Sequence, residues 1–284
     1  MKEKIGKVVL DDTYYPGEDL YSDGAVEDEM LEIARTYPEK KWNQVIAERK
    51  SWPVLYHFSH IRENIISWLP FTGEENVLEI GSGCGAVTGA LCKRAKKVTC
   101  IELSKKRSQI NAWRHRKFDN LTILMGNFQE IERSLTEEYD YITLIGVFEY
   151  GENYIDSSSP FVDFLKTVAS HLKPGGKIIL AIENRFGLKY WAGCTEDHFG
   201  TLFEGLEGYP TTKGVFSSSS MVVVFGAPRL ARGVRNTKRV AFPPGNPFAF
   251  PFVGRIENFR LFCLHALRRC HLKQGQAVFQ HGAG

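Results

Sequence analysis

The stretch that decides the fold runs from residue 77 to residue 102 and reads VLEIGSGCGAVTGALCKRAKKVTCIE. Its first four residues, 77–80, have the composition of a buried parallel strand. Three glycines then occupy alternate positions, and a helix is expected to begin directly after them. A second apolar run, 98–101, predicts the next strand and ends in Glu102. The glycines are Gly81, Gly83 and Gly85.

These glycines have a physical purpose, because a chain that turns tightly from a strand into a helix needs positive φ angles and a backbone that a ligand can approach. Glu102 lies 23 positions beyond Glu79, near the offset at which a carboxylate on the next strand reaches a ribose. The stretch therefore predicts a site for a nucleoside-bearing cofactor. The glycine spacing alone is ambiguous, since Gly81, Gly83 and Ala86 also satisfy the G-x-G-x-x-G/A pattern of dinucleotide sites.

Two further features favour a different cofactor, namely Glu79 inside the strand end and Gly85 as the third glycine. Together with the downstream order of strands, they resemble the E/D-x-G-x-G-x-G signature of class I S-adenosylmethionine-dependent methyltransferases, over about residues 61–209. The resemblance implies a Rossmann-like α/β fold, S-adenosyl-L-methionine as cofactor and methyl transfer as activity. A nicotinamide or flavin enzyme and a purely structural glycine turn stay open as alternatives.

The expected fold is a doubly wound parallel sheet with helices on both faces, because apolar runs alternate with stretches of helical periodicity. Ser104 is a plausible N-cap for the helix that follows the second strand. Pro174 and the two glycines after it are expected to end a helix and turn the chain into the last strand. The predicted strands are 77–81, 97–102, 121–125, 140–147 and 177–183.

Three domains are expected along the 284 residues: an N-terminal lid and helical extension over 1–70, the cofactor domain over 71–212, and an atypical tail over 213–284. The extension begins with an acidic, aromatic, turn-rich stretch at 11–24. Helices are expected after it, and the last of them places Ile61, Ile65 and Trp68 on one face. They cover 26–35, 40–50 and 54–68.

The tail follows different rules from the rest of the chain. Residues 213–284 hold eleven Lys or Arg and a single acid, Glu257, although the net charge of the whole chain is only +3. Only the run 221–225 has the pattern of a strand, and it stands alone, whereas methyltransferases of this class usually end in a helix and two further strands. The tail is therefore expected to be divergent or disordered, or even to be read in another frame, and a disordered tail would leave the edge of the last strand open.

Composition favours a cytoplasmic protein. No apolar run approaches the roughly 20 residues of a membrane span, and the first ten residues lack a signal-peptide core. No metal site is expected, because the spacing of the one Cys and His cluster fits no standard zinc finger. That cluster contains Cys263, His265, Cys270 and His271.

Ligands of such sheets bind beyond the carboxyl ends of the strands, where the strand order reverses. The resemblance implies that Glu79 and the glycine loop serve the methionine part of the cofactor and that Glu102 accepts hydrogen bonds from the ribose. Asn127 and Phe128 follow the third strand, where they are predicted to contact the adenine. Asn127 departs from the acidic residue common in the family, and an ordinary turn or core role stays open for both.

The catalytic base is sought near the ends of the last two strands. The fourth strand ends in IGVFEY, which lacks the Asn or Asp followed by Pro-Pro-Tyr that is common in methyltransferases acting on amines. If the acceptor is a hydroxyl, His198 is the first candidate base, followed by Glu149 and Glu183. Arg185 and Tyr190 are candidate acceptor-binding residues in the polar loop after the fifth strand. An ordinary loop role for His198, a helix-capping role for Glu149 and a solvated charge at Arg185 remain open.

The acceptor is expected to be a small molecule or a glycan. That expectation depends on resemblance alone, because the segments YYPGEDLYSDG, SHIRENI and IENRFGLKYW are similar to those of a bacterial methyltransferase subgroup associated with cell-surface glycan assembly. A non-catalytic scaffold with the same fold stays open. So does a nucleic-acid methyltransferase whose basic tail contacts phosphates, although a nucleic-acid partner is less favoured. The sequence does not indicate the oligomeric state.

Overall fold

The computed structural model describes residues 2–19, 21–150, 160–184, 187–196, 200–207 and 222–226. The chain divides into two compact units. The first unit is formed by two segments, the described residues up to Ala181 and the later stretch 222–226. The described residues of the second unit lie between 182 and 207. The tail beyond residue 226, with the Cys and His cluster, lies outside the described residues.

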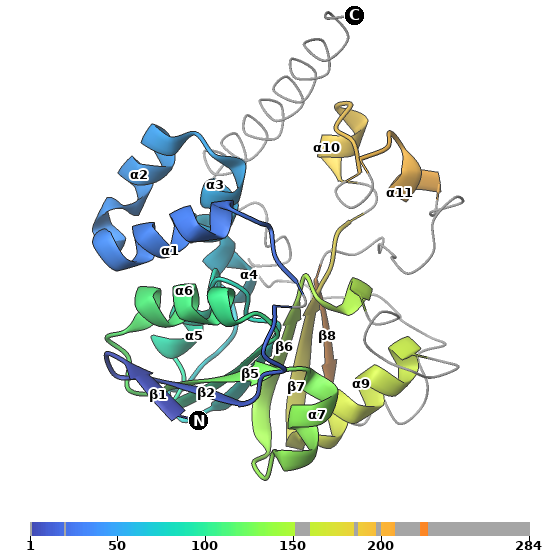
Figure 1. Ribbon diagram of the computed structural model, residues 1–284. Helices are drawn as coiled ribbons and strands as arrows, with labels where there is room; N and C mark the ends of the chain where they lie inside the picture. Colours follow the sequence, from blue (N-terminus) through green and yellow to red (C-terminus); the bar gives the residue numbers. More distant parts are fainter. Residues whose placement is uncertain are drawn as a thin grey trace, which may run out of the picture. The chain divides into compact units, whose positions relative to one another are not determined.

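A single sheet forms the centre of the first unit, with the described strands in the order β1-β2-β5-β4-β3-β6-β7-β8 (Figure 1). From β3 the chain proceeds to β4 and β5 on one side and to β6 and β7 on the other, with all these neighbours parallel. This confirms the predicted doubly wound sheet and puts the reversal of strand order at β3. The five predicted strands are β3 (Asn76–Ile80), β4 (Lys97–Glu102), β5 (Leu121–Gly126), β6 (Tyr139–Ile145) and β7 (Leu172–Ala181).

An N-terminal hairpin extends the sheet beyond the predicted strands. It consists of β1 (Lys2–Ile5) and β2 (Val8–Tyr14), which are antiparallel to each other. β2 also lies parallel to β5, so that Tyr14 pairs with Gly126. The sequence does not reveal this strand, because the apolar run at its start is followed by two aspartates, of which Asp11 pairs with Lys2 of β1 in the folded sheet.

The run expected to stand alone is paired instead. β8 (Val222–Gly226) lies antiparallel to β7, with Ala181 opposite Val222 and Lys177 opposite Gly226. β7 therefore has a strand partner along this stretch, so the open edge that a disordered tail would leave is absent from the described residues. Three consecutive valines suit a strand whose backbone completes the hydrogen bonds of an exposed edge.

The helices largely follow the expected periodicity. Ser104 caps α6, because its side chain accepts a hydrogen bond from Arg107 N. The single helix expected over 54–68 is wrong, since Ser59 has extended backbone angles and its hydroxyl accepts from Ile61 N, which starts a new turn. In the first unit the described helices are α1 (Val26–Thr36), α2 (Trp42–Arg49), α3 (Trp52–Phe58), α4 (Asn64–Ser67), α5 (Thr88–Cys92), α6 (Lys105–His115), α7 (Phe128–Ile131) and α9 (Pro160–Ser170), with 3-10 turns η1 (Glu39–Lys41), η2 (His60–Glu63), η3 (Glu132–Ser134) and η4 (Phe148–Tyr150). The second unit contains α10 (Leu188–Trp191) and α11 (Glu204–Glu207).

Helices cover both faces of the sheet. On one face, Cys100 and Ile123 pack in a buried cluster with Leu91 of α5 and Ala112 of α6. Figure 1 shows α7 and α9 against the opposite face. None of the described helices combines the length and the apolar composition that crossing a bilayer requires.

The N-terminal helices form a second cluster that reaches the glycine loop. Met30 of α1, Trp42 of α2 and Phe58 of α3 pack together with Cys84 and with Ile110 of α6. Because Cys84 lies between two of the three loop glycines, these helices support the turn from β3 to α5 from outside the sheet.

Candidate functional site

Two of the three glycines are required by close packing. Gly81 follows β3 with φ +70°, and a Cβ there would lie 2.2 Å from Val147 Cγ2. Gly85 has φ +76°, and a Cβ there would lie 2.3 Å from the side-chain oxygen of Asn111 in α6. Both contacts are far inside van der Waals distance, so a larger residue at either position would push the loop away from its neighbours.

Gly83 is different, because the space that a side chain would occupy at this position contains none of the described atoms. Its φ is +52°, and a Cβ there would meet none of the described atoms within 4 Å. Its backbone N–H donates a hydrogen bond of 2.6 Å to Glu102 Oε2. The hydroxyl oxygen of the preceding residue, Ser82, is buried without a hydrogen-bond partner among the described residues. The loop thus offers bare backbone and an unused polar atom next to a carboxylate.

Glu102 is held by backbone N–H groups at the end of β4. Its Oε1 accepts from Ser104 N at 3.0 Å, while its Oε2 accepts from Gly83 N. Burial raises the pKa of Glu102, and the N–H of Ser104, the charge of Arg107 and the N–H of Gly83 lower it only in part. A carboxylate oxygen has two lone pairs, so each oxygen of Glu102 can still accept a further hydrogen bond.

These observations fit a nucleoside cofactor at the carboxyl edge of β3 and β4. Bare backbone at Gly83 permits close approach, the Ser82 hydroxyl has capacity for a ligand, and the fixed carboxylate of Glu102 suits a pair of hydroxyls. The sequence predicted that the glycine loop and Glu102 both belong to the cofactor site, but not that a hydrogen bond from Gly83 N–H joins them.

Glu79 lies beneath the loop within the sheet and helix core. Its Oε2 accepts from the hydroxyl of Thr88 at 2.6 Å and from the thiol of Cys100 at 3.3 Å. Asn111 donates to Thr88 at 3.1 Å and lies 2.7 Å from a ring nitrogen of His115. Burial raises the pKa of Glu79 to about 7, although the bonds from Thr88 and Cys100 oppose the shift. The hydrogen bonds of Glu79 with Thr88 and Cys100 thus support the loop from below, and its predicted role toward the methionine part stays a prediction.

The two residues after β5 have structural partners. Asn127 caps α7, because its side-chain oxygen accepts from Gln129 N at 3.0 Å. Phe128 is buried, and its ring packs edge-on against Phe164 at 5.4 Å and against His171 at 6.5 Å. The ring therefore packs in the core beside α9, Asn127 remains at the strand end, and the predicted adenine contacts of both residues stay predictions.

Glu149 is the predicted catalytic residue that the first unit places near this edge. It lies in η4 directly after β6 and is buried. A Cβ built on Gly146 would lie 3.8 Å from Glu149 Oε1, so the carboxyl lies beside the turn that leaves β6. Its predicted role as a base stays a prediction.

The second unit brings two other predicted residues together. The hydroxyl of Tyr190 donates to Glu183 Oε2 at 3.1 Å, and Lys189 Nζ lies 3.7 Å from Glu183 Oε1. Tyr190 is buried. The predictions for His198 and Arg185 lie outside the described residues.

The sequence predicted an N-terminal lid, but not the strand pairing that brings the segment after β2 to the same edge. Because Tyr14 pairs with Gly126, the residues after β2 emerge beside the ends of β5 and β4. Asp19 lies there and accepts a hydrogen bond from Lys105 N at 2.6 Å. The signal available in the sequence was the short apolar run Val8 to Leu10, which is too brief to predict a strand alone.

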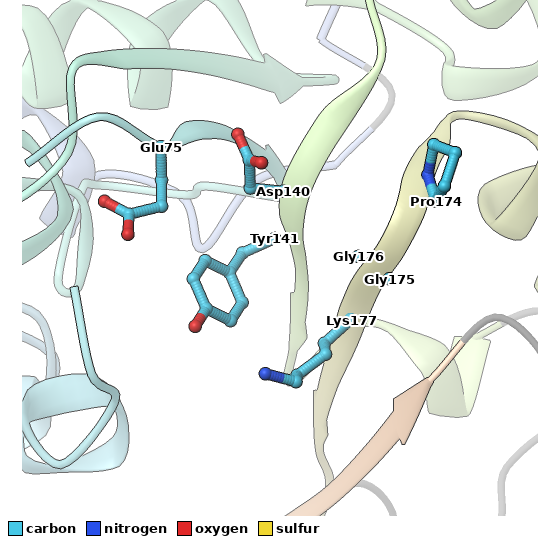
Figure 2. A pocket seen from close by; sticks show the side chains of 7 residues that line it. All are labelled: Glu75, Asp140, Tyr141, Pro174, Gly175, Gly176 and Lys177. Atoms are coloured by element: carbon cyan, nitrogen blue, oxygen red, sulfur yellow. The ribbon is translucent and has the colours of Figure 1, made fainter. Parts of the chain in front are cut away.

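A separate pocket lies at the opposite edge of the sheet, near the amino ends of β3 and β6 (Figure 2). Its volume is about 190 Å³, below the roughly 300–1,000 Å³ of typical small-molecule sites. Asp140 accepts here from Asn76 N and from Lys173, so this carboxylate holds the strands together. The pocket is distant from the glycine loop along the strands and does not contribute to the candidate site. Its lining comprises Glu75, Asp140, Tyr141, Pro174, Gly175, Gly176 and Lys177.

Comparison with known proteins shows which family the central part of the chain resembles. Residues 78–178 match the family model described as a methyltransferase domain, a range that includes the glycine loop, Glu102, β5 and β6. The matched part of the chain is therefore similar to methyltransferase domains, and the cofactor of that class is S-adenosylmethionine.

Individual relatives are similar over parts of their length. The chain is 35% identical over 100 residues to ribosomal RNA small subunit methyltransferase A of Borreliella afzelii, covering 35% of this chain and 34% of that protein. It is 28% identical over 124 residues to demethylmenaquinone methyltransferase of Tropheryma whipplei, covering 43% of this chain and 47% of that protein. The chain thus matches about a third to a half of the length of these relatives. Among solved structures, phosphoethanolamine N-methyltransferase 1 of Haemonchus contortus matches with a TM-score of 0.41 and 16% identity, over 64% of this chain and 36% of that one.

Proposed function

We propose that this chain transfers a methyl group from S-adenosylmethionine to an oxygen atom of a small-molecule or glycan acceptor. One observation carries the cofactor part of the proposal, namely the bond from Gly83 N–H to Glu102 beside a backbone face that no described side chain covers. The match of residues 78–178 to a methyltransferase domain supports the transfer itself.

The task of the protein is mainly to hold the reactants. S-adenosylmethionine, when bound, supplies a methyl group on a positively charged sulfur, and displacement from that sulfur disperses charge. Glu102 would hold the ribose hydroxyls, and the backbone from Ser82 to Gly83 would lie along the rest of the cofactor. Fixed placement of an acceptor against the methyl group then supplies most of the acceleration.

An oxygen acceptor is favoured by the residues after β6. The segment IGVFEY lacks the Asn or Asp with Pro-Pro-Tyr that accepts hydrogen bonds from an attacking amine. A hydroxyl acceptor must lose a proton, and a carboxylate or imidazole can receive it. Glu149, next to Gly146, is the base that we propose within the first unit, with His198 and Glu183 as the other candidates.

A nucleic-acid acceptor is the second candidate. The observation in its favour is the similarity to ribosomal RNA small subunit methyltransferase A, which recurs among several bacterial relatives. The excess of Lys and Arg after residue 212 would suit contacts with phosphates. The missing Pro-Pro-Tyr type of segment is evidence against transfer to a base amine.

One experiment separates these acceptors. The full chain is incubated with cofactor carrying a labelled methyl group and with glycan, lipid or nucleic-acid fractions, and the labelled product is identified by mass spectrometry. Label in an oxygen of a glycan or small molecule is expected. Label confined to ribosomal RNA would establish the second candidate, and no label in any fraction together with tight binding of S-adenosylhomocysteine would indicate a scaffold.

Replacement of Glu102 by Ala is expected to weaken binding of S-adenosylhomocysteine by about ten- to a hundredfold. Charge-assisted hydrogen bonds contribute about 1.5–3 kcal/mol, and the variant removes both oxygens that face the ribose. Isothermal titration calorimetry measures the change, with circular dichroism to verify the fold. An unchanged dissociation constant would mean that the ribose is held elsewhere.

A further inference from the structure

The segment after β2 ends in a carboxylate that caps helix α6. Asp19 Oδ1 accepts from Lys105 N at 2.6 Å, and Asp19 Oδ2 accepts from the Ser104 hydroxyl at 3.1 Å and from Lys106 N at 3.3 Å. The hydroxyl of Tyr15 donates to Asp19 Oδ1 at 3.1 Å. A segment from the N-terminal hairpin thus supplies the cap of a helix that begins more than eighty residues later.

Ser104 connects this cap directly to Glu102. Its backbone N–H donates to Glu102 Oε1 at 3.0 Å, while its hydroxyl donates to Asp19 Oδ2. Ser104 is fully buried, and its hydroxyl oxygen also accepts from Arg107 N at 3.3 Å. The hydroxyl has a single proton, which is committed to Asp19. The position of the N–H that holds Glu102 therefore depends on the position of Asp19.

Charge does not oppose this arrangement. Burial raises the pKa of Asp19, but four hydrogen bonds to its carboxylate lower the pKa by more, so the net shift is downward. These bonds come from the N–H groups of Lys105 and Lys106 and the hydroxyls of Ser104 and Tyr15. The positive end of the α6 dipole faces both carboxylates, which offsets their mutual repulsion. Asp19 is thus ionised at neutral pH and holds the start of α6 tightly.

We propose that Asp19 is a positioning residue for the cofactor site, which fixes Ser104 and thereby orients Glu102 toward the ribose. The inference rests on the proposed use of S-adenosylmethionine. Because linkage is reciprocal, a cofactor that fixes Glu102 also stabilises the docking of the segment 15–19 on α6.

The competing interpretation is that Asp19 only caps helix α6 and has no effect on the cofactor site. A matched control variant distinguishes the two roles. Glu75 is a buried carboxylate at the opposite edge of the sheet that likewise caps a turn, accepting from Thr72 N at 2.8 Å and Gly73 N at 3.0 Å. Glu75→Gln and Asp19→Asn each remove one charge and one acceptor oxygen. If Asp19 only stabilises the fold, the two variants behave alike in ligand binding.

Titration calorimetry of the full chain with S-adenosylhomocysteine is the test. Asp19→Asn is expected to weaken binding by about five- to fiftyfold, whereas Glu75→Gln changes it by less than about twofold. In a Glu102→Gln background the effect of Asp19→Asn should fall below about twofold, since its action passes through Glu102. Binding by Asp19→Asn equal to that of the wild type, or an undiminished effect in the Glu102→Gln background, would overturn the proposal.

Two further measurements test the proposal if Asp19→Asn does not fold. Ser104→Ala keeps the N–H to Glu102 but removes the hydroxyl link, and it is expected to weaken binding similarly to Asp19→Asn. In the wild-type protein, S-adenosylhomocysteine is expected to slow hydrogen exchange at the amides of Lys105 and Lys106. Slowed exchange at Gly83 with no change at Lys105 and Lys106 would overturn the role of Asp19, whereas a wild type that binds no S-adenosylhomocysteine would refute the proposed function itself.

Discussion

Replacement of Gly83 by Val is expected to abolish measurable binding of S-adenosylhomocysteine while the domain stays folded. A Cβ at this position meets none of the described atoms within 4 Å, so the protein itself has room for a side chain. The space that the side chain would fill lies beside Ser82 and Glu102, where we place the cofactor. Steric exclusion from the site is expected to weaken affinity by at least about a thousandfold, or roughly 4 kcal/mol.

Backbone strain has to be separated from this effect. Gly83 has a φ of +52°, and a residue other than glycine in the left-handed conformation destabilises the folded state by roughly 1–2 kcal/mol. Gly73 provides the control, since it too has a positive φ and open space around its Cβ, but it lies in the turn before β3. Gly73→Val is expected to lower the melting temperature and leave affinity unchanged. Calorimetry and thermal denaturation of both variants measure the two effects, and wild-type affinity in Gly83→Val would place the cofactor elsewhere.

Replacement of Glu79 by Gln is expected to make the protein more stable than the wild type at pH 8 but not at pH 5. The pKa of Glu79 is raised from 4.5 to about 7 in the folded protein. Between those values the folded state keeps a proton that the unfolded chain has released, so the free energy of unfolding falls as pH rises through this window. Above about pH 7 the loss is complete, and for a shift of this size it amounts to about 3 kcal/mol.

The variant isolates this contribution from other titrations. His57 and His115 are buried and have lowered pKa values, because burial disfavours their charged forms, and they increase stability as pH rises over the same range. Their effects cancel in the difference between wild type and Glu79→Gln. Urea unfolding at several pH values from about 5 to 8 gives that difference. Parallel pH profiles for the two proteins would show that Glu79 does not bind a proton on folding.

Most of the central sheet could be predicted because its strands carry strong local signals. Val77 to Ile80 and Val98 to Ile101 are apolar runs followed by a glycine loop or an acid, and parallel strands buried on both faces require such runs. β2 and β8 could not be placed in the same way, since their position depends on which strand edge they meet. Nothing local to Val8 or Val222 specifies a partner in β5 or β7.

In the candidate site, too, residues with a local sequence signal could be predicted and residues that depend on long-range contacts could not. Glycines at fixed spacing and a carboxylate at the next strand end form a pattern in the sequence, so Gly83 and Glu102 were predicted. Phe128 was predicted as a ligand contact from its position after β5, and that contact stays a prediction. The aromatic partners that bury its ring come from α9 and beyond, so no local pattern could indicate them. Asp19 has no motif, and its importance depends on one long-range contact with Ser104.

The pairing of β2 with β5 has a consequence for the order of folding. Leu10 lies beside Ile123, so during synthesis the residues of β2 have no parallel partner until the chain has been made beyond β5. Contacts of such long sequence separation form late, because the intervening loop must first be closed. During synthesis the apolar residues of β2 are therefore exposed while β3 and β4 form, and we expect the N-terminal hairpin to dock on the sheet only after β5 has been made.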